Sequence, residues 1–125
     1  MKAYNLILLI EGGDCYKLSF DYVISHPGWT LVHGIPTGTG GNAIGRQYGH
    51  AWVEKDDEVY DPSAKIKIHK LIYYSIGNIE YTVRYTKDEA MDLASKHETY
   101  GPWDKTINKS YHSPEPKRKK KRDDI

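Results

Sequence analysis

The sequence has little of three things: it contains one cysteine, one phenylalanine and no apolar run longer than about five residues. A single cysteine, Cys15, excludes an internal disulfide and leaves one thiol, which in most proteins is a small buried apolar group. The apolar run at residues 6–10 is too short to span a bilayer, and it leads into Glu-Gly-Gly-Asp rather than into a signal-peptide cleavage site. We therefore expect a cytoplasmic protein that makes no contact with a membrane.

An excess of charge of one sign is also missing, since 18 basic residues face 17 acidic ones for a net charge of +1. The run Lys117–Arg122 holds six of the basic residues and is followed by two acidic ones, so residues 1–116 carry a balance of −3. Such a mildly acidic body argues against an extended nucleic-acid-binding face. The basic run predicts a weak, salt-sensitive contact with nucleic acid, and a plain solvated tail is the alternative.

The composition, with 38% hydrophobic and 28% charged residues, is that of an ordinary globular protein of one domain. After residue 111 the sequence turns to Ser-Pro-Glu-Pro and the basic run, which cannot bury apolar surface. We expect one domain over residues 1–111 and a disordered basic tail over residues 112–125.

The segment Gly49–Pro62 carries the strongest structural signal. Two stretches that alternate apolar and polar residues flank four charged residues, a pattern typical of a β-hairpin. Side chains alternate along a strand, so His50, Trp52 and Glu54 are expected on one face of the first strand. Because Glu54 lies beside the turn, we expect its carboxylate to be solvated rather than catalytic.

This hairpin brings an imidazole next to a carboxylate. With a turn at residues 54–57, Val53 pairs with Glu58, and His50 lies opposite Asp61 or within one residue of it. Cross-strand neighbours on one face have Cβ atoms roughly 4.5–5.5 Å apart. Asp61 can then hold the ring of His50 in one tautomer and stabilise its charged form, which is the role of the acid in a nucleophile–histidine–acid triad.

The candidate nucleophile lies earlier in the chain. Asp14 is a good N-cap residue, and the apolar spacing after it predicts a helix that begins near Cys15 and ends before Pro27-Gly28. Thiols in the first turn of a helix are favoured as thiolates, and the free N–H groups there can stabilise an oxyanion. The alternative is that Cys15 packs inward and Asp14 is only a cap.

Further elements follow from periodicity and capping. The pattern predicts a strand over residues 29–34 with Trp29 and His33 on one face, then a glycine-rich loop without the ending of a phosphate-binding loop. Beyond the hairpin it predicts a short helix over residues 70–76, a strand over residues 79–85, and a helix that begins with the Thr86–Glu89 capping box and runs to about His97.

Zinc binding is one alternative use of these polar groups, since His33 could join Cys15, His50 and Asp61, which are all competent ligands. The short spacings of metal-binding motifs are missing, however. We therefore expect no metal and no cofactor, and we expect His33 to be structural or to contact a substrate.

The order Cys15, His50, Asp61 matches that of papain-like and transglutaminase-like thiol enzymes. The hexapeptide Gly-His-Ala-Trp-Val-Glu at residues 49–54, followed by Asp61-Pro62, resembles the transglutaminase-core signature, and Gly-Asp-Cys at residues 13–15 resembles the start of that superfamily's cysteine-bearing helix. The later part of the chain is similar to small phage-encoded proteins. This resemblance implies an α+β fold in which an N-terminal helix bearing the cysteine packs on a small antiparallel sheet.

The resemblance also implies an activity, namely a thiol-dependent hydrolase or acyltransferase that cleaves a peptide, isopeptide or side-chain amide of a protein or peptide substrate. Cys15 would be the nucleophile, His50 the general base and then acid, and Asp61 the residue that orients the ring. A cysteine peptidase, a deamidase and a transglutaminase-like acyltransferase all remain open.

The sequence departs from the papain-like pattern in one respect, because no glutamine precedes the cysteine to hold the oxyanion. Backbone N–H groups at Cys15 or the indole of Trp29 would have to replace it, and His33 and Trp52 are candidates for substrate contacts. The alternative function is an inactive fold of the same type that binds a protein or acts as an inhibitor.

Overall fold

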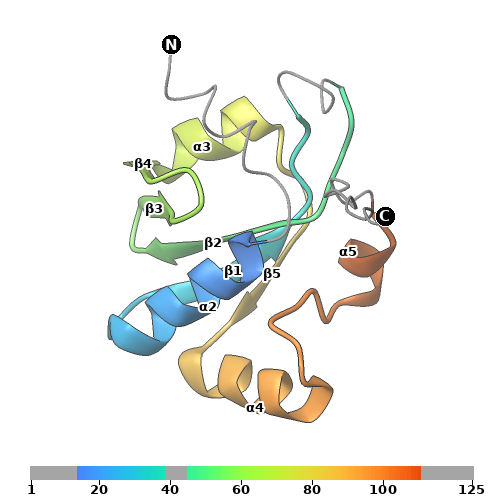
Figure 1. Cartoon of the computed structure of the whole chain (residues 1–125). Coiled ribbons are helices and arrows are strands. Elements are labelled where there is room, and N and C mark those ends of the chain that lie inside the picture. Colours follow the sequence, from blue (N-terminus) through green and yellow to red (C-terminus); the bar gives the residue numbers. More distant parts are fainter. Residues whose placement is uncertain (1–13, 39–44, 111–125) are drawn as a thin grey trace, which may run out of the picture.

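A computed structural model describes residues 14–38 and 45–110 of the chain (Figure 1). They form an α+β fold with one five-stranded antiparallel sheet of order β4-β3-β2-β1-β5. The strands are β1 (Thr30–Gly34), β2 (His50–Lys55), β3 (Glu58–Asp61), β4 (Ile66–His69) and β5 (Thr82–Tyr85). The helices are α2 (Cys15–Ser25), α3 (Lys70–Gly77), α4 (Lys87–His97) and α5 (Lys105–Lys109).

The helix α2 begins where the sequence predicts, with Asp14 at the N-cap and Cys15 as its first residue. The side chain of Asp14 makes no capping hydrogen bond, however, because its backbone is helical, with φ −87° and ψ −11°, instead of extended. Residues four apart share a helix face, and Cys15, Ser19 and Val23 are accordingly all buried against the sheet. Figure 1 shows α2 lying across the sheet.

The central strand β2 is covered on both faces. Ala51 packs with the first turn of α2, and Val53 lies in the cluster that also contains Val23 of that helix. Trp52 points the other way and packs with Tyr73 of α3. Because residues 50–54 are all buried, β2 is a core strand and not a half-exposed strand of a surface hairpin.

The predicted hairpin is present, but its register differs from the prediction by two residues. The turn consists of Asp56 and Asp57 alone, with Asp56 at φ 55°, so β2 extends to Lys55 and Val53 pairs with Tyr60 rather than with Glu58. A shift of two residues keeps every side chain on its predicted face, whereas a shift of one would have reversed them all. Asp61 therefore still shares a face with His50, as a diagonal neighbour.

The remaining predictions hold with adjusted ends. The predicted helix over residues 70–76 is α3, and the alternation just before it belongs to the short strand β4. The helix α4 has the predicted capping box and ends at His97, whereas the strand predicted from residue 79 starts only at Thr82. The helix α5, which no pattern predicted, has Asp104 as its N-cap, and the carboxylate of Asp104 accepts from two backbone N–H groups.

Several predictions lie outside the described residues. They concern the apolar run at residues 6–10, part of the glycine-rich loop, and the basic tail with Lys117–Arg122. Among residues 14–38 and 45–110, no helix has the length and apolar character needed to cross a membrane.

Candidate active site

The centre of the site is the pair His50–Asp61. Nε2 of His50 lies 2.8 Å from Oδ2 of Asp61, and the two side chains are 1% and 0% exposed. A carboxylate only accepts hydrogen bonds, so Nε2 carries the proton and donates. The other ring nitrogen, Nδ1, makes no hydrogen bond of regular geometry.

The carboxylate of Asp61 is held on both oxygens. Oδ1 accepts from the hydroxyl of Ser63 at 2.8 Å and from the backbone N–H groups of Ser63 and Ala64. Oδ2, which already accepts from His50, also accepts from the hydroxyl of Tyr73 at 2.7 Å. The acid is thus fixed in position by the loop after β3 and by α3, and its charge is neutralised within a buried network.

Cys15 reaches this pair from the opposite face of the sheet. It starts α2 at the end of the sheet where His50 starts β2, and its thiol lies close enough to the imidazole to interact with it electrostatically. Because Asp61 occupies Nε2, Nδ1 is the nitrogen left for the thiol, although the contact does not have the geometry of a regular hydrogen bond. The three predicted triad residues are therefore brought together.

Opposing effects set the pKa of His50. Burial alone would lower it, but the neighbouring Asp61 and Cys15 outweigh burial and raise the pKa of His50 well above its ordinary value. For Asp61, burial works in the raising direction, and the charge and hydrogen bond of His50 together with the hydroxyls of Tyr73 and Ser63 bring its pKa below the ordinary value. Both shifts favour the charged forms of the two groups.

The thiol itself is not open to solvent, because Cys15 is only 1% exposed. It packs with Tyr16 and Ala51 in a small buried cluster. A carbonyl group can reach the sulfur only when this part of the protein opens locally.

His33 is buried beside the triad but does not belong to it. Its ring packs edge-on against Tyr16 and Tyr85 and lies 5.2 Å from the ring of Trp103, and neither ring nitrogen has a hydrogen-bond partner. Burial, followed by repulsion from His50, lowers the pKa of His33 to about 3. It is therefore a neutral core residue, with no exposed surface for a substrate.

Two tryptophans predicted to contact the substrate or the oxyanion do not lie where that role requires. Trp29 precedes the end of β1 that pairs with Glu54, about 13 Å along the strand from the end that pairs with His50. Its ring packs against Tyr22, in the C-terminal half of α2. Trp52 is fully buried in the core. The predictions for Trp29 and Trp52 are therefore wrong, because both indoles are used for packing.

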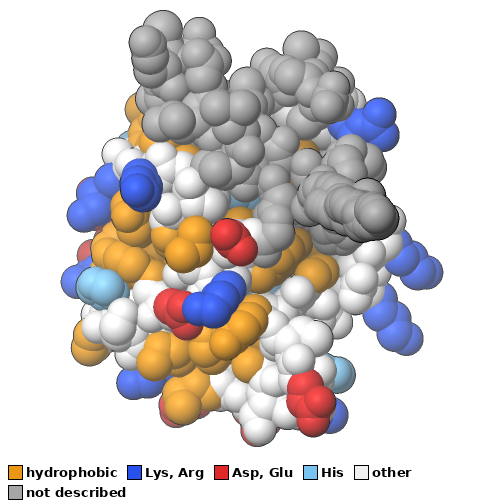
Figure 2. All heavy atoms as spheres, viewed as in Figure 1, with side chains coloured by type: hydrophobic (Ala, Val, Ile, Leu, Met, Phe, Trp, Pro, Cys, Tyr) orange, Lys and Arg blue, Asp and Glu red, His pale blue; other side chains and the backbone are white. Residues whose placement is uncertain are grey.

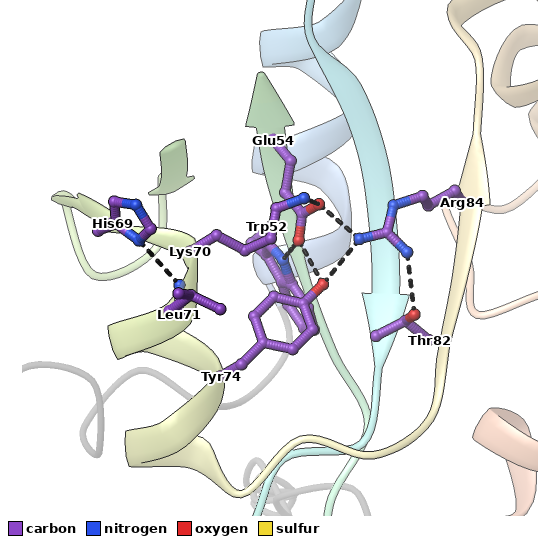
Figure 3. Close-up of polar contacts among 8 residues, drawn as sticks. All are labelled: Trp52, Glu54, His69, Lys70, Leu71, Tyr74, Thr82 and Arg84. Carbon is purple, nitrogen blue, oxygen red and sulfur yellow. Dashed lines mark hydrogen bonds and ion pairs between the residues drawn. The ribbon is translucent and has the colours of Figure 1, made fainter. Parts of the chain in front are cut away.

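The prediction that the carboxylate of Glu54 is solvated is also wrong. Glu54 is 4% exposed and lies in a polar network on the α3 side of the sheet (Figure 3). Its Oε2 accepts from the indole of Trp52 at 2.9 Å and from the hydroxyl of Tyr74. Its Oε1 pairs with Arg84 at 2.6 Å and with Lys70 at 3.6 Å. Apart from Trp52 on the same strand, its partners come from two elements remote in sequence, α3 and β5, so the hairpin pattern alone could not reveal this burial.

Within the described ranges, no three His, Cys, Asp or Glu side chains converge as metal ligands would. Nε2 of His50 is hydrogen-bonded to Asp61 and is therefore not free to bind a metal. The zinc alternative therefore has no ligand set in this part of the chain.

An apolar groove lies apart from the triad, between α2 and α4. It has a volume of about 400 Å³ and is lined by Phe20, Met91, Ala94, Ser95, Glu98, Thr99 and Tyr100. Met91 and Tyr100 are more than a third exposed, and Figure 2 shows several apolar side chains on the face of the molecule in view. This groove is a surface feature that could receive a partner.

Comparisons of the chain with protein-family models, with curated proteins and with solved structures found no match.

Proposed function

We propose that the protein is a thiol-dependent hydrolase or acyltransferase with a papain-like or transglutaminase-like core. It acts in the cytoplasm on a peptide, isopeptide or side-chain amide bond of a protein or peptide. The observation that carries the proposal is the hydrogen bond from Nε2 of His50 to Asp61, which leaves Nδ1 for the thiol of Cys15. An imidazole held in this way can exchange a proton with a nucleophile.

The residues would act in two stages. The sulfur of Cys15 attacks the carbonyl carbon of the substrate, and its proton is held at Nδ1 of His50. When the tetrahedral intermediate collapses, the C–N bond breaks and the leaving amine takes that proton, leaving a thioester on Cys15. Water or an amine then gives a proton to Nδ1 and attacks the thioester carbonyl, the C–S bond breaks to release the acid or the new amide, and the proton returns to the sulfur. Hydrolysis by water is our first choice.

Backbone N–H groups at the start of α2 are the oxyanion donors in this proposal. The first N–H groups of a helix have no partner within it, and the side chain of Asp14 makes no cap bond to them.

Labelling with electrophilic amide probes tests the proposal. Wild type should form a covalent adduct that Cys15→Ala lacks, and mass spectrometry of the trapped acyl group should identify the substrate class. Since Cys15 is the single cysteine, no second thiol competes. Labelling that is absent, or equal in Cys15→Ala, contradicts the proposal.

A second candidate is a noncatalytic binding module, which the burial of Cys15 and the open groove at Phe20, Met91 and Tyr100 favour. Alkylation by iodoacetamide at pH 6 separates the two functions. If His50 activates the thiol, wild type should react roughly tenfold faster than His50→Gln, in which Cys15 stays buried but has no imidazole beside it. Equal rates in two folded proteins favour the binding module.

A further inference from the structure

The strongest unassigned feature near the site is a pair of adjacent tyrosines on α3. Tyr73 donates its hydroxyl proton to Oδ2 of Asp61 at 2.7 Å, while Tyr74 donates to Glu54. The two hydroxyls thus bind different carboxylates of the β2–β3 hairpin. One of these carboxylates belongs to the triad and the other does not.

The position of Tyr73 is fixed by packing before its hydroxyl makes any bond. The side chain is buried, and its ring lies 5.3 Å from that of Trp52 in the cluster formed with Val32 and Val59. The helix itself is tied to the hairpin turn by the bond from the backbone N–H of Lys70 to the carbonyl of Asp57. A rigid ring on an anchored helix can therefore hold a hydroxyl at one point in space.

The Tyr73 hydroxyl donates to the same Asp61 oxygen that accepts from His50. Oδ2 accepts from Tyr73 and from Nε2 of His50, while the other oxygen of Asp61 is held by Ser63 and Ala64. With both oxygens engaged, the carboxylate cannot rotate away from the imidazole. Without the Tyr73 hydroxyl, only His50 itself would hold Oδ2.

We propose that Tyr73 is a positioning residue, which fixes the Asp61 oxygen that accepts from His50 and so aims the imidazole at Cys15. Its catalytic consequence rests on the proposed thiol chemistry, whereas its effect on the His50–Asp61 pair does not. The substitution Tyr73→Phe removes the hydroxyl and keeps the ring. Tyr74→Phe is a matched control, because it removes the neighbouring hydroxyl of the same helix from a carboxylate outside the triad.

The first measurement is proton NMR of the His50 ring. In wild type and Tyr74→Phe the proton on Nε2 should exchange slowly with water, and in Tyr73→Phe it should exchange at least about tenfold faster, because the acceptor is less firmly held. Equal exchange in all three folded proteins overturns the proposal.

The second measurement follows the pH profile of Cys15 alkylation. Tyr73→Phe should shift the profile that depends on His50 and slow alkylation at pH 6 by about tenfold, whereas Tyr74→Phe should reproduce the wild-type profile. A wild-type profile in Tyr73→Phe overturns the positioning role. If no protein is labelled by amide probes but the NMR difference is present, the thiol activity fails and the positioning of the pair stands.

Wild type alone offers a further test if Tyr73→Phe does not fold. The hydroxyl proton of Tyr73 should be visible by NMR as a slowly exchanging signal, and its chemical shift should follow the titration of His50, with which it shares an acceptor. A hydroxyl signal that stays constant while His50 titrates overturns the proposal.

Discussion

The carboxylate of Glu54 on β2 and the guanidinium of Arg84 on β5 meet across the intervening strand β1, with 2.6 Å between Oε1 and Nη2. The two partners are in different environments, because Glu54 is 4% exposed and the Arg84 side chain is 45% exposed. The carboxylate of Glu54 has lost its hydration and depends on Arg84 to stabilise its charge, whereas the guanidinium of Arg84 is still hydrated.

Removing the arginine should destabilise the protein more than neutralising the glutamate. Arg84→Met leaves a buried charge with Lys70 at 3.6 Å as its remaining cation, whereas Glu54→Gln leaves a guanidinium that water solvates. After allowance for solvent screening at Arg84, we expect losses of about 2 kcal/mol and about 1 kcal/mol in the free energy of unfolding at pH 7. Urea denaturation measures both, and equal losses would contradict this asymmetry.

The His50–Asp61 pair should stabilise the protein within a definite pH window. The raised pKa of His50 gives stability that is complete below about pH 6.5 and lost as the pH rises through its folded-state value. The lowered pKa of Asp61 gives stability that is complete above about pH 4 and lost as the pH falls through its folded-state value. Asp61→Asn should therefore cost most between these limits, about 3 kcal/mol. Urea melts from pH 3 to pH 9 test this, and a cost that does not vary with pH contradicts it.

His33 should make the protein sensitive to acid. Its folded-state pKa of about 3 lies below the unfolded value, so the unfolded chain binds the extra proton first and stability falls as the pH drops below about 6.5. His33→Leu should remove roughly 3 kcal/mol of this loss between pH 7 and pH 4. The same substitution at exposed His97 is the control. Parallel pH curves for wild type and His33→Leu would show that His33 does not carry the effect.

Gly101 should not tolerate alanine. Its φ is 120°, and an added Cβ would lie 2.6 Å from Cε1 of His33 and 3.2 Å from Cδ1 of Tyr16. We expect Gly101→Ala to cost more than about 2 kcal/mol, from strain and from displacement of the His33 ring. Gly45→Ala, with φ 72° and no atom within 4 Å of the new Cβ, should cost about 1 kcal/mol. Thermal melting of both variants decides, and equal losses contradict the steric argument.

Local signals in the sequence were sufficient for several elements. The Thr86–Glu89 capping box predicts the start of α4, because caps depend on residues close in sequence, whereas α2 begins after Asp14 as predicted but without a capping bond from its side chain. The hairpin followed from alternation, which fixes the face of each side chain but not the register. His50 and Asp61 therefore lie together as expected, although the turn of the hairpin begins two residues later than predicted.

Contacts between distant segments were not predictable in this way. The burial of Glu54 depends on Arg84 and Tyr74, and the hydroxyl that holds Asp61 belongs to Tyr73, on a helix that the pattern defined only roughly. The sequence pattern does not show where Trp29 lies relative to the site, because that depends on how β1 pairs with β2. The burial of Glu54, the contact of Tyr73 and the position of Trp29 all depend on how distant elements pack together.

The two-residue turn at Asp56 and Asp57 limits how this hairpin can change in evolution. A slip of β3 by two residues against β2 would keep Asp61 on the face of His50, in a different row of the ladder. An odd insertion absorbed by the second strand would carry Asp61 through the sheet into the apolar layer beneath α2. Homologous chains that keep the chemistry should therefore confine odd insertions to the turn, where added residues leave the faces of both strands unchanged.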